Sequence, residues 1–131
     1  MKGLDTNVLV RYLTQDDPQQ ARAANAVIAR AVEESSRLRV DDVVVCEVVW
    51  VLRHAYRFDR RTISSTLDKV LSTGLFAFED RERLRQALDD YRGSRGDFAD
   101  YVIGRRNLSS GCESTVTFDR DLESSPAFTL L

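Results

Sequence analysis

Short apolar segments alternate with longer amphipathic ones along this chain. Strand-like segments are expected at residues 1–4, 38–40, 75–78, 114–118 and 127–131. Between them, apolar residues recur at the spacing of a helix face, most clearly in residues 21–32. Strands separated by helices pair in parallel, with helices covering both faces of the sheet. The alternation therefore predicts an α/β fold: an α/β/α sandwich with a central, mainly parallel sheet.

Polar residues indicate where the longer helices begin and end. Pro18 suits the first turn of a helix that closes in a polar run. Asp41 or Asp42 can cap the helix "VVVCEVVWVLRHAY", which is apolar almost all round and is therefore expected to be largely buried. Asp59 precedes a helix over residues 60–72. Further helices are expected at residues 8–13, 80–96 and 97–108.

Length and composition restrict the class of protein. A chain of 131 residues suits one domain, and we expect a single domain over residues 1–131. The content of 43% hydrophobic and 31% charged residues is that of an ordinary globular protein. Because no apolar run is long enough for a membrane span or a signal peptide, we expect a cytoplasmic protein with no membrane partner. The cysteines Cys46 and Cys112 are expected to be reduced and packed as small hydrophobic residues.

Acidic residues follow several of the predicted strands. Asp5 comes directly after the first strand, and Asp119 directly after "STVTF". Asp97 and Asp100 share one face at the start of a helix, and Glu47 lies within the apolar helix after the second strand. In a parallel sheet, ligands bind beyond the carboxyl ends of the strands. The sequence thus predicts a group of carboxylates at that edge.

Each of these acids also has a purely structural interpretation. Asp5 and Asp97 could simply cap helices, and Asp119 could belong to a turn. Asp100 could lie on the surface, and Glu47 could pair with an arginine. Taken together, however, four or five carboxylates that gather at one edge would repel one another. A divalent cation relieves that repulsion. Mg²⁺ prefers oxygen ligands and serves phosphodiester hydrolysis.

Other chemistries are poorly supported by the residues present. The only histidine, His54, offers no zinc spacing, and neither a GxSxG nor a phosphate-loop motif occurs. A dehalogenase-like phosphatase needs an acid where Asn7 stands, together with a downstream lysine. Because Lys69 is badly placed for that role, the phosphatase is excluded, and a receiver-type signalling module fails for similar reasons.

Four segments together resemble the PIN-domain ribonucleases of the VapC type. They are "LDTNVLVRYL", "VVVCEVVWVLRHAY", "GDFADYVIGRRN" and "TVTFDRDL", and their order and separations cover essentially the whole chain. The resemblance implies an RNase-H-like α/β/α fold. It also implies a metal-dependent endoribonuclease with Mg²⁺, for which Mn²⁺ can substitute. A modest departure occurs in "RVDDVVVCE", where relatives often carry proline, serine or threonine before the helix.

The resemblance also assigns roles to individual residues. The acidic quartet of the family corresponds to Asp5, Glu47, Asp100 and Asp119. Asp97 matches an adjoining acidic position, so the expected metal ligands are Asp5, Asp97, Asp100 and Asp119. Polar residues that would brace the site are Thr6, Asn7 and Thr117. On physical grounds, independent of the resemblance, three arginines could contact RNA phosphates and offset the negative pocket, although each could instead be a solvated surface residue: Arg11, Arg105 and Arg106.

The same resemblance implies three partners: an RNA substrate, a cognate antitoxin and a second copy of the chain. Antitoxins of this class commonly wrap a groove made by the early helices. Residues 21–32 and 60–75 are therefore possible contact surfaces, although both segments could simply be core. The alternative from another class of function is a non-catalytic RNA- or protein-binding adaptor with the same fold.

Overall fold

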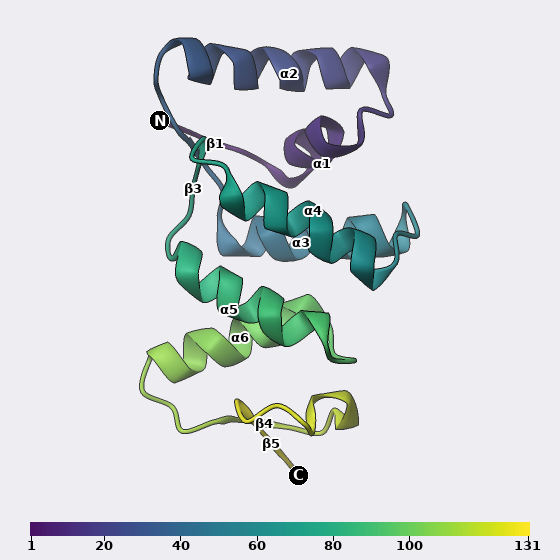
Figure 1. Cartoon of the computed structure of the whole chain (residues 1–131), viewed down its shortest axis with the longest axis vertical. Coiled ribbons are helices and arrows are strands. Elements are labelled where there is room, and N and C mark those ends of the chain that lie inside the picture. Colours follow the sequence, from purple (N-terminus) through teal and green to yellow (C-terminus); the bar gives the residue numbers. More distant parts are fainter. The chain divides into compact units, whose positions relative to one another are not determined.

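The computed structural model describes residues 1–131 and divides them into two units, Met1–Glu79 and Asp80–Leu131. Six α-helices and five short strands build these units, and Figure 1 labels most of them.

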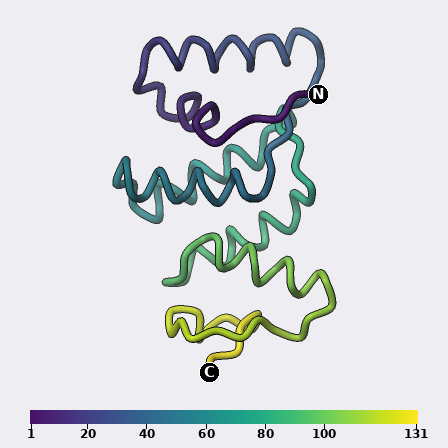
Figure 2. Tube along the Cα trace, turned by 180° about the vertical axis from the view of Figure 1, so that it is seen from behind, coloured from purple at the N-terminus to yellow at the C-terminus, as the bar shows by residue number.

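The first unit contains three strands and four helices. In chain order they are β1 (Lys2–Gly3), α1 (Thr6–Thr14), α2 (Pro18–Glu33), β2 (Leu38–Arg39), α3 (Asp42–His54), α4 (Arg60–Ser72) and β3 (Phe76–Ala77). The strands pair in parallel in the order β1-β2-β3, and Lys2 stands opposite Leu38, which stands opposite Phe76. Figures 1 and 2 both show α2 alongside α1, and α1 also packs against α3.

Aspartate side chains begin three of these helices, and the sequence predicts two of these caps, before α3 and before α4. Asp17 accepts a hydrogen bond from the Gln20 N–H at the start of α2, where Pro18 occupies the first turn. Asp41, rather than the buried Asp42, accepts the Val43 N–H at the start of α3. Asp59 caps α4 in the same way. Each carboxylate satisfies an amide that has no partner within its helix.

Helix α3 is buried along one face only. Its inward face is lined by Val45, Val48, Val49 and Leu52. In contrast, Val43 is 58% exposed and Trp50 is 62% exposed, so the prediction of a largely buried helix is wrong. The sequence does not show which face of α3 is buried, because apolar residues also occupy the positions that face solvent.

The second unit contains two helices, two strands and a single 3₁₀ turn. They are α5 (Arg81–Arg92), α6 (Phe98–Ser109), β4 (Thr115–Thr117), η1 (Arg120–Leu122) and β5 (Phe128–Leu130). Helix α5 packs on α6, where the Tyr91 and Phe98 rings meet edge to face at 5.8 Å between centroids. Strands β4 and β5 pair in parallel, with Thr115 opposite Phe128.

The predicted α/β fold class is confirmed, because helices connect the strands of the first unit and every strand pairing is parallel. These pairings fall into two sets, one in each unit. The single domain over residues 1–131 stays a prediction. Neither cysteine forms a disulfide; Cys46 is partly buried, but Cys112 is exposed, so its predicted packing is wrong. No helix combines the length and the apolar character needed to cross a membrane.

Candidate active site

Two of the predicted acids, Asp5 and Glu47, belong to the first unit. Asp5 follows β1 and occupies the N-cap position of α1, yet its side chain accepts no hydrogen bond from the first turn of that helix. The next residue, buried Thr6, donates its hydroxyl hydrogen to Glu47 Oε2 on α3 at 2.9 Å. This bond connects the strand end that carries Asp5 to the helix that carries Glu47.

Glu47 lies on the exposed part of α3. A carboxylate within an apolar helix must reach water or find a donor, because burying an unpaired charge is costly. Glu47 does both: it is exposed, and it accepts the Thr6 hydroxyl. The Thr6 hydroxyl is a neutral donor and brings no opposite charge to Glu47.

The other three acids belong to the second unit. Asp97 is the N-cap residue of α6, and Asp100 lies one turn further along the helix. The Asp97 N–H donates to Asp100 Oδ2 at 3.3 Å, so the Asp100 carboxylate folds back over the start of the helix. Asp100 is partly buried, whereas Asp97 is exposed.

Asp119 lies just beyond β4, where the sequence predicts it. Its Oδ1 accepts the Asp121 N–H at 2.9 Å and so caps η1. The Asp119 N–H in turn donates to the Thr117 hydroxyl at 3.0 Å. Thr117 therefore fixes the turn from which the Asp119 side chain projects. The structural interpretation of Asp119 as a turn residue therefore also holds, because its side chain caps η1.

The electrostatics of Asp100 show that the acids of the second unit influence one another. Burial raises the pKa of the Asp100 carboxyl above its usual value. The hydrogen bond from the Asp97 backbone lowers this pKa, while the negative charges of Asp97 and Asp119 raise it further. The group thus carries mutual repulsion that a bound cation would relieve.

The donor set fits a hard divalent cation, because it consists of carboxylate oxygens. In neither unit, however, do three or more His, Cys, Asp or Glu side chains converge closely enough to form a complete metal site. Mg²⁺ commonly uses only one or two protein carboxylates and keeps several water molecules. Asp100 with one neighbouring acid is compatible with that mode of binding.

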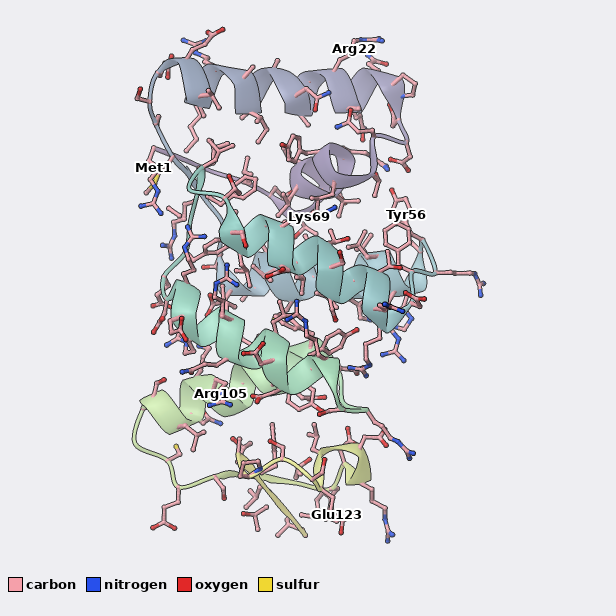
Figure 3. The ribbon with its side chains drawn as sticks, in the orientation of Figure 1. Met1, Arg22, Tyr56, Lys69, Arg105 and Glu123 are labelled. Carbon is pink, nitrogen blue, oxygen red and sulfur yellow. The ribbon has the colours of Figure 1, made fainter.

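The arginines proposed to contact RNA are engaged with protein groups. Arg11 donates to both Asp16 oxygens at 3.0 Å, to the Tyr56 hydroxyl and to Gln20. Arg105, which is labelled in Figure 3, holds Asp90 through two hydrogen bonds of 2.7 and 2.8 Å. Contact with a phosphate would require these two arginines to exchange partners. Arg106 is exposed on α6.

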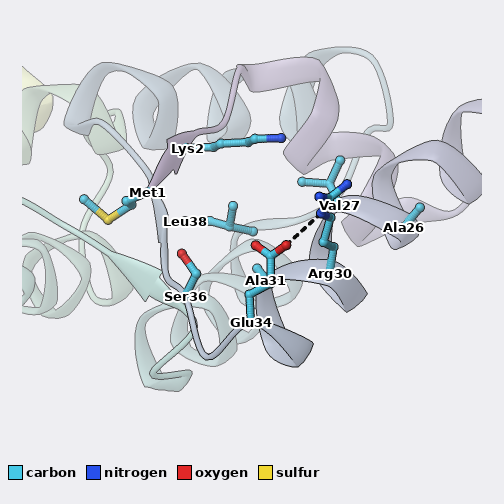
Figure 4. Close-up of a pocket in the computed structure, with 9 residues that line it drawn as sticks. All are labelled: Met1, Lys2, Ala26, Val27, Arg30, Ala31, Glu34, Ser36 and Leu38. Atoms are coloured by element: carbon cyan, nitrogen blue, oxygen red, sulfur yellow. Dashed lines mark hydrogen bonds and ion pairs between the residues drawn. The ribbon is translucent and has the colours of Figure 1, made fainter.

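The remaining candidates lie outside the acid groups. His54 is exposed and its ring lies 4.6 Å from that of Trp50, as befits a surface histidine. Asn7 and Arg11 line a cavity of about 270 Å³ between α1 and α2, whose other lining residues are mostly apolar. A second cavity, of about 330 Å³, lies beside β1 and α2 and contains none of the predicted site residues; Figure 4 shows the Arg30–Glu34 ion pair there.

Sequence reasoning did not single out Tyr101. It follows Asp100 directly within the helix predicted over residues 97–108. The sole local signal was its position beside a predicted ligand. Its hydroxyl accepts the N–H of Gly96, the residue before Asp97, at 3.0 Å within the protein interior. This pairing depends on the turn between α5 and α6, which residue patterns do not specify.

Comparison with known proteins identifies the class. The family model described as "PIN domain" matches residues 3–126, a range that includes all five predicted acids. The chain therefore belongs to the PIN domain family. It is also similar to a VapC ribonuclease of Aquifex aeolicus (strain VF5), with 27% identity over 120 residues. That similarity covers 92% of this chain and 88% of its relative.

Proposed function

We propose that this protein is a Mg²⁺-dependent endoribonuclease and the toxin of a toxin–antitoxin pair. The similarity to a ribonuclease over 92% of the chain supports nuclease activity. The observation that carries the proposed metal dependence is the environment of Asp100. This carboxyl is partly buried, and the negative charges of Asp97 and Asp119 raise its pKa. Such a group favours a cation, and cations assist phosphodiester hydrolysis.

In this proposal Asp100 holds the ion together with a neighbouring acid of the second unit, Asp97 or Asp119. The family resemblance adds Asp5, which belongs to the first unit, to the expected ligands. When bound, the ion would supply positive charge to neutralise the phosphate and to acidify a water molecule. Glu47, whose carboxylate accepts the Thr6 hydroxyl, would accept a hydrogen bond from the attacking water. Thr117 keeps Asp119 oriented through its backbone. Hydrolysis would leave a 3′-hydroxyl and a 5′-phosphate.

The biological partners follow from the same assignment. The proposal includes an RNA substrate, a cognate antitoxin that blocks the site, and a homodimer acting in the cytoplasm, where RNA is available. Of the possible antitoxin contacts, Val32 on α2 is 63% exposed, whereas Ala21, Ala24 and Ala31 are buried. Much of the apolar stripe at residues 21–32 thus serves the core.

The direct test is cleavage of single-stranded RNA by the purified chain. We expect cleavage with Mg²⁺ or Mn²⁺ and none in EDTA. We also expect the Asp5→Asn and Asp100→Asn variants to lose roughly 100-fold in rate while remaining folded. Asp89→Asn, which alters an exposed ion pair with Arg92, is the matched control and should cleave normally. Native-like cleavage in EDTA, or by both site variants, would refute the mechanism.

The toxin role needs a separate test in cells. Expression of the chain alone should arrest growth, and the Asp100→Asn variant should not. Sequencing the 5′ ends of cellular RNA after induction would identify the target. Unimpaired growth with confirmed folded protein would reject the toxin role without rejecting the nuclease chemistry.

One observation favours the alternative of a non-catalytic adaptor. Neither unit contains by itself three acids arranged to hold a metal ion. An adaptor would bind RNA or a protein partner with the same affinity in EDTA as in Mg²⁺, and would leave the RNA intact. The cleavage assay therefore separates the two functions.

A further inference from the structure

We propose that Tyr101 is a positioning residue, which sets the relative placement of Asp97, Asp100 and Asp119 through Gly96 and Leu122. This inference rests on the proposed function, because it concerns the carboxylates that would hold the cation. All the contacts that carry it lie within the second unit. Tyr101 itself is not assigned a contact with metal or RNA.

The first contact is a buried hydrogen bond. The Gly96 N–H donates to the Tyr101 hydroxyl at 3.0 Å. Gly96 immediately precedes Asp97, and Tyr101 immediately follows Asp100. The bond therefore closes a loop around the start of α6, on which both carboxylates stand. It acts alongside the bond from the Asp97 N–H to the Asp100 carboxylate.

The second contact brings in the segment that carries Asp119. A Cβ atom at Gly96 would overlap Leu122 Cδ2 and lie 2.7 Å from the Tyr101 hydroxyl oxygen. Leu122 is 2% exposed and ends η1, the turn that Asp119 caps. A larger residue at position 96 would have to displace the ends of the Tyr101 and Leu122 side chains. The Gly96 backbone thereby joins the start of α6 to the turn after β4.

The Tyr101 ring is itself fixed in place. It is 1% exposed and meets the Phe128 ring of β5 edge to face, with 6.4 Å between centroids. Gly104, on the next turn of α6, makes room for that ring: a Cβ there would lie 2.8 Å from Phe128 Cε2. The hydroxyl that accepts the Gly96 N–H is therefore held by packing from β5.

This packing resists the repulsion between the acids. Asp97 and Asp119 both act on Asp100 through their charges, which favours their separation when no cation is bound. Asp97 directly follows Gly96, and Asp100 directly precedes Tyr101. The Leu122 N–H donates to the Asp119 carbonyl at 3.1 Å. Removing the Tyr101 hydroxyl should let the three segments shift, and supporting contacts of this kind commonly affect metal affinity or activity by about 10- to 100-fold.

The test compares Tyr101→Phe with Tyr91→Phe. Both tyrosines are 1% exposed in the second unit, and each substitution keeps the ring contact with a phenylalanine. For Tyr101→Phe we expect Mn²⁺ affinity, measured by electron paramagnetic resonance, to fall about 10-fold. The turnover number should fall by a similar factor, with KM for RNA nearly unchanged. Tyr91→Phe should stay within about twofold of the native chain in all three quantities.

A second readout separates this inference from the proposed function. Backbone NMR signals of Asp97, Asp100 and Asp119 should shift together in Tyr101→Phe but not in Tyr91→Phe. If the native chain cleaves RNA and Tyr101→Phe matches it in Mn²⁺ affinity and turnover, the positioning role is wrong. If the native chain neither binds Mn²⁺ nor cleaves RNA, the proposed function is wrong. If the NMR signals of Asp97, Asp100 and Asp119 do not shift in Tyr101→Phe, the positioning role of Tyr101 is wrong. Should Tyr101→Phe not fold, Leu122→Met must show the same losses to a smaller degree; otherwise the inference is rejected.

Discussion

At the scale of single residues, one hydroxyl connects two helices of the first unit. Thr6 on α1 donates to Glu47 on α3, 41 residues further along the chain. The sequence points to both residues. Thr6 is selected by the family resemblance, and Glu47 is selected both by the resemblance and because a carboxylate in an apolar helix must reach water or a hydrogen-bond donor. Sequence reasoning could not select the bond, because the distance between two helices is set by packing over the whole unit.

Replacing Thr6 with valine tests this bond. Thr6→Val keeps the shape of the buried side chain but removes the donor to Glu47. We expect RNA cleavage to slow about 10-fold, because Glu47 loses its fixed orientation. Thr66→Val is the control, since the Thr66 hydroxyl bonds only the carbonyl one turn back in α4. Equal rates for Thr6→Val and the native chain would exclude a role for the bond.

Asp16 gives a prediction about pH. The hydrogen bond from the Tyr56 hydroxyl, followed by that from Thr14, holds the pKa of Asp16 at about 2. Figure 3 labels Tyr56, which lies just beyond α3. Because the folded-state pKa is depressed, the stabilisation is complete above the unfolded-state pKa of about 3.9. It is lost as pH falls through about 2.

The Asp16→Asn variant should therefore have a lower melting temperature than the native chain at pH 7. The difference should shrink progressively between pH 4 and pH 2, where the native chain loses the advantage of the charged form. Thermal melts monitored by circular dichroism across this range check the prediction. Glu33→Gln, a charge change at the exposed end of α2, serves as the control. A difference in melting temperature that does not depend on pH would contradict the account.

At the scale of elements, the helices were predictable and their environments were less so. Residues 60–72 were expected as a helix, and α4 spans Arg60–Ser72, because Asp59 caps it and an apolar stripe runs along it. In α3 the repeated valines fit any face, so burial could not be assigned from the sequence. Strands of two or three residues leave too little pattern to fix their ends.

The cap of α5 provides a test at this scale. Asp80 accepts the Arg83 N–H at 3.0 Å. We expect Asp80→Ala to lower the free energy of unfolding by about 1 kcal/mol, because an amide in the first turn loses its partner. Asp80→Ser should retain most of that stability. Chemical denaturation measures both, with Gln86→Ala on the exposed face of α5 as the control. A loss as large in Gln86→Ala would show that capping is not the cause.

At the scale of the whole molecule, the family match spans both units, and so do the predicted acids. Asp5 and Glu47 belong to the first unit, while Asp97, Asp100 and Asp119 belong to the second. The sequence predicts their joint action from strand ends and from resemblance. Within the units, the structure adds the Thr6–Glu47 bond and the mutual repulsion around Asp100.

Single-turnover cleavage of RNA by Asp5→Asn, Asp100→Asn and the double variant is the most direct measurement of this joint action. When two residues act together in one reaction, the rate losses of the two single variants do not multiply in the double variant. We predict that the double variant cleaves RNA within about threefold of the slower single variant. Losses that multiply in the double variant, or native rates in either single variant, would contradict a reaction that depends on both acid groups together.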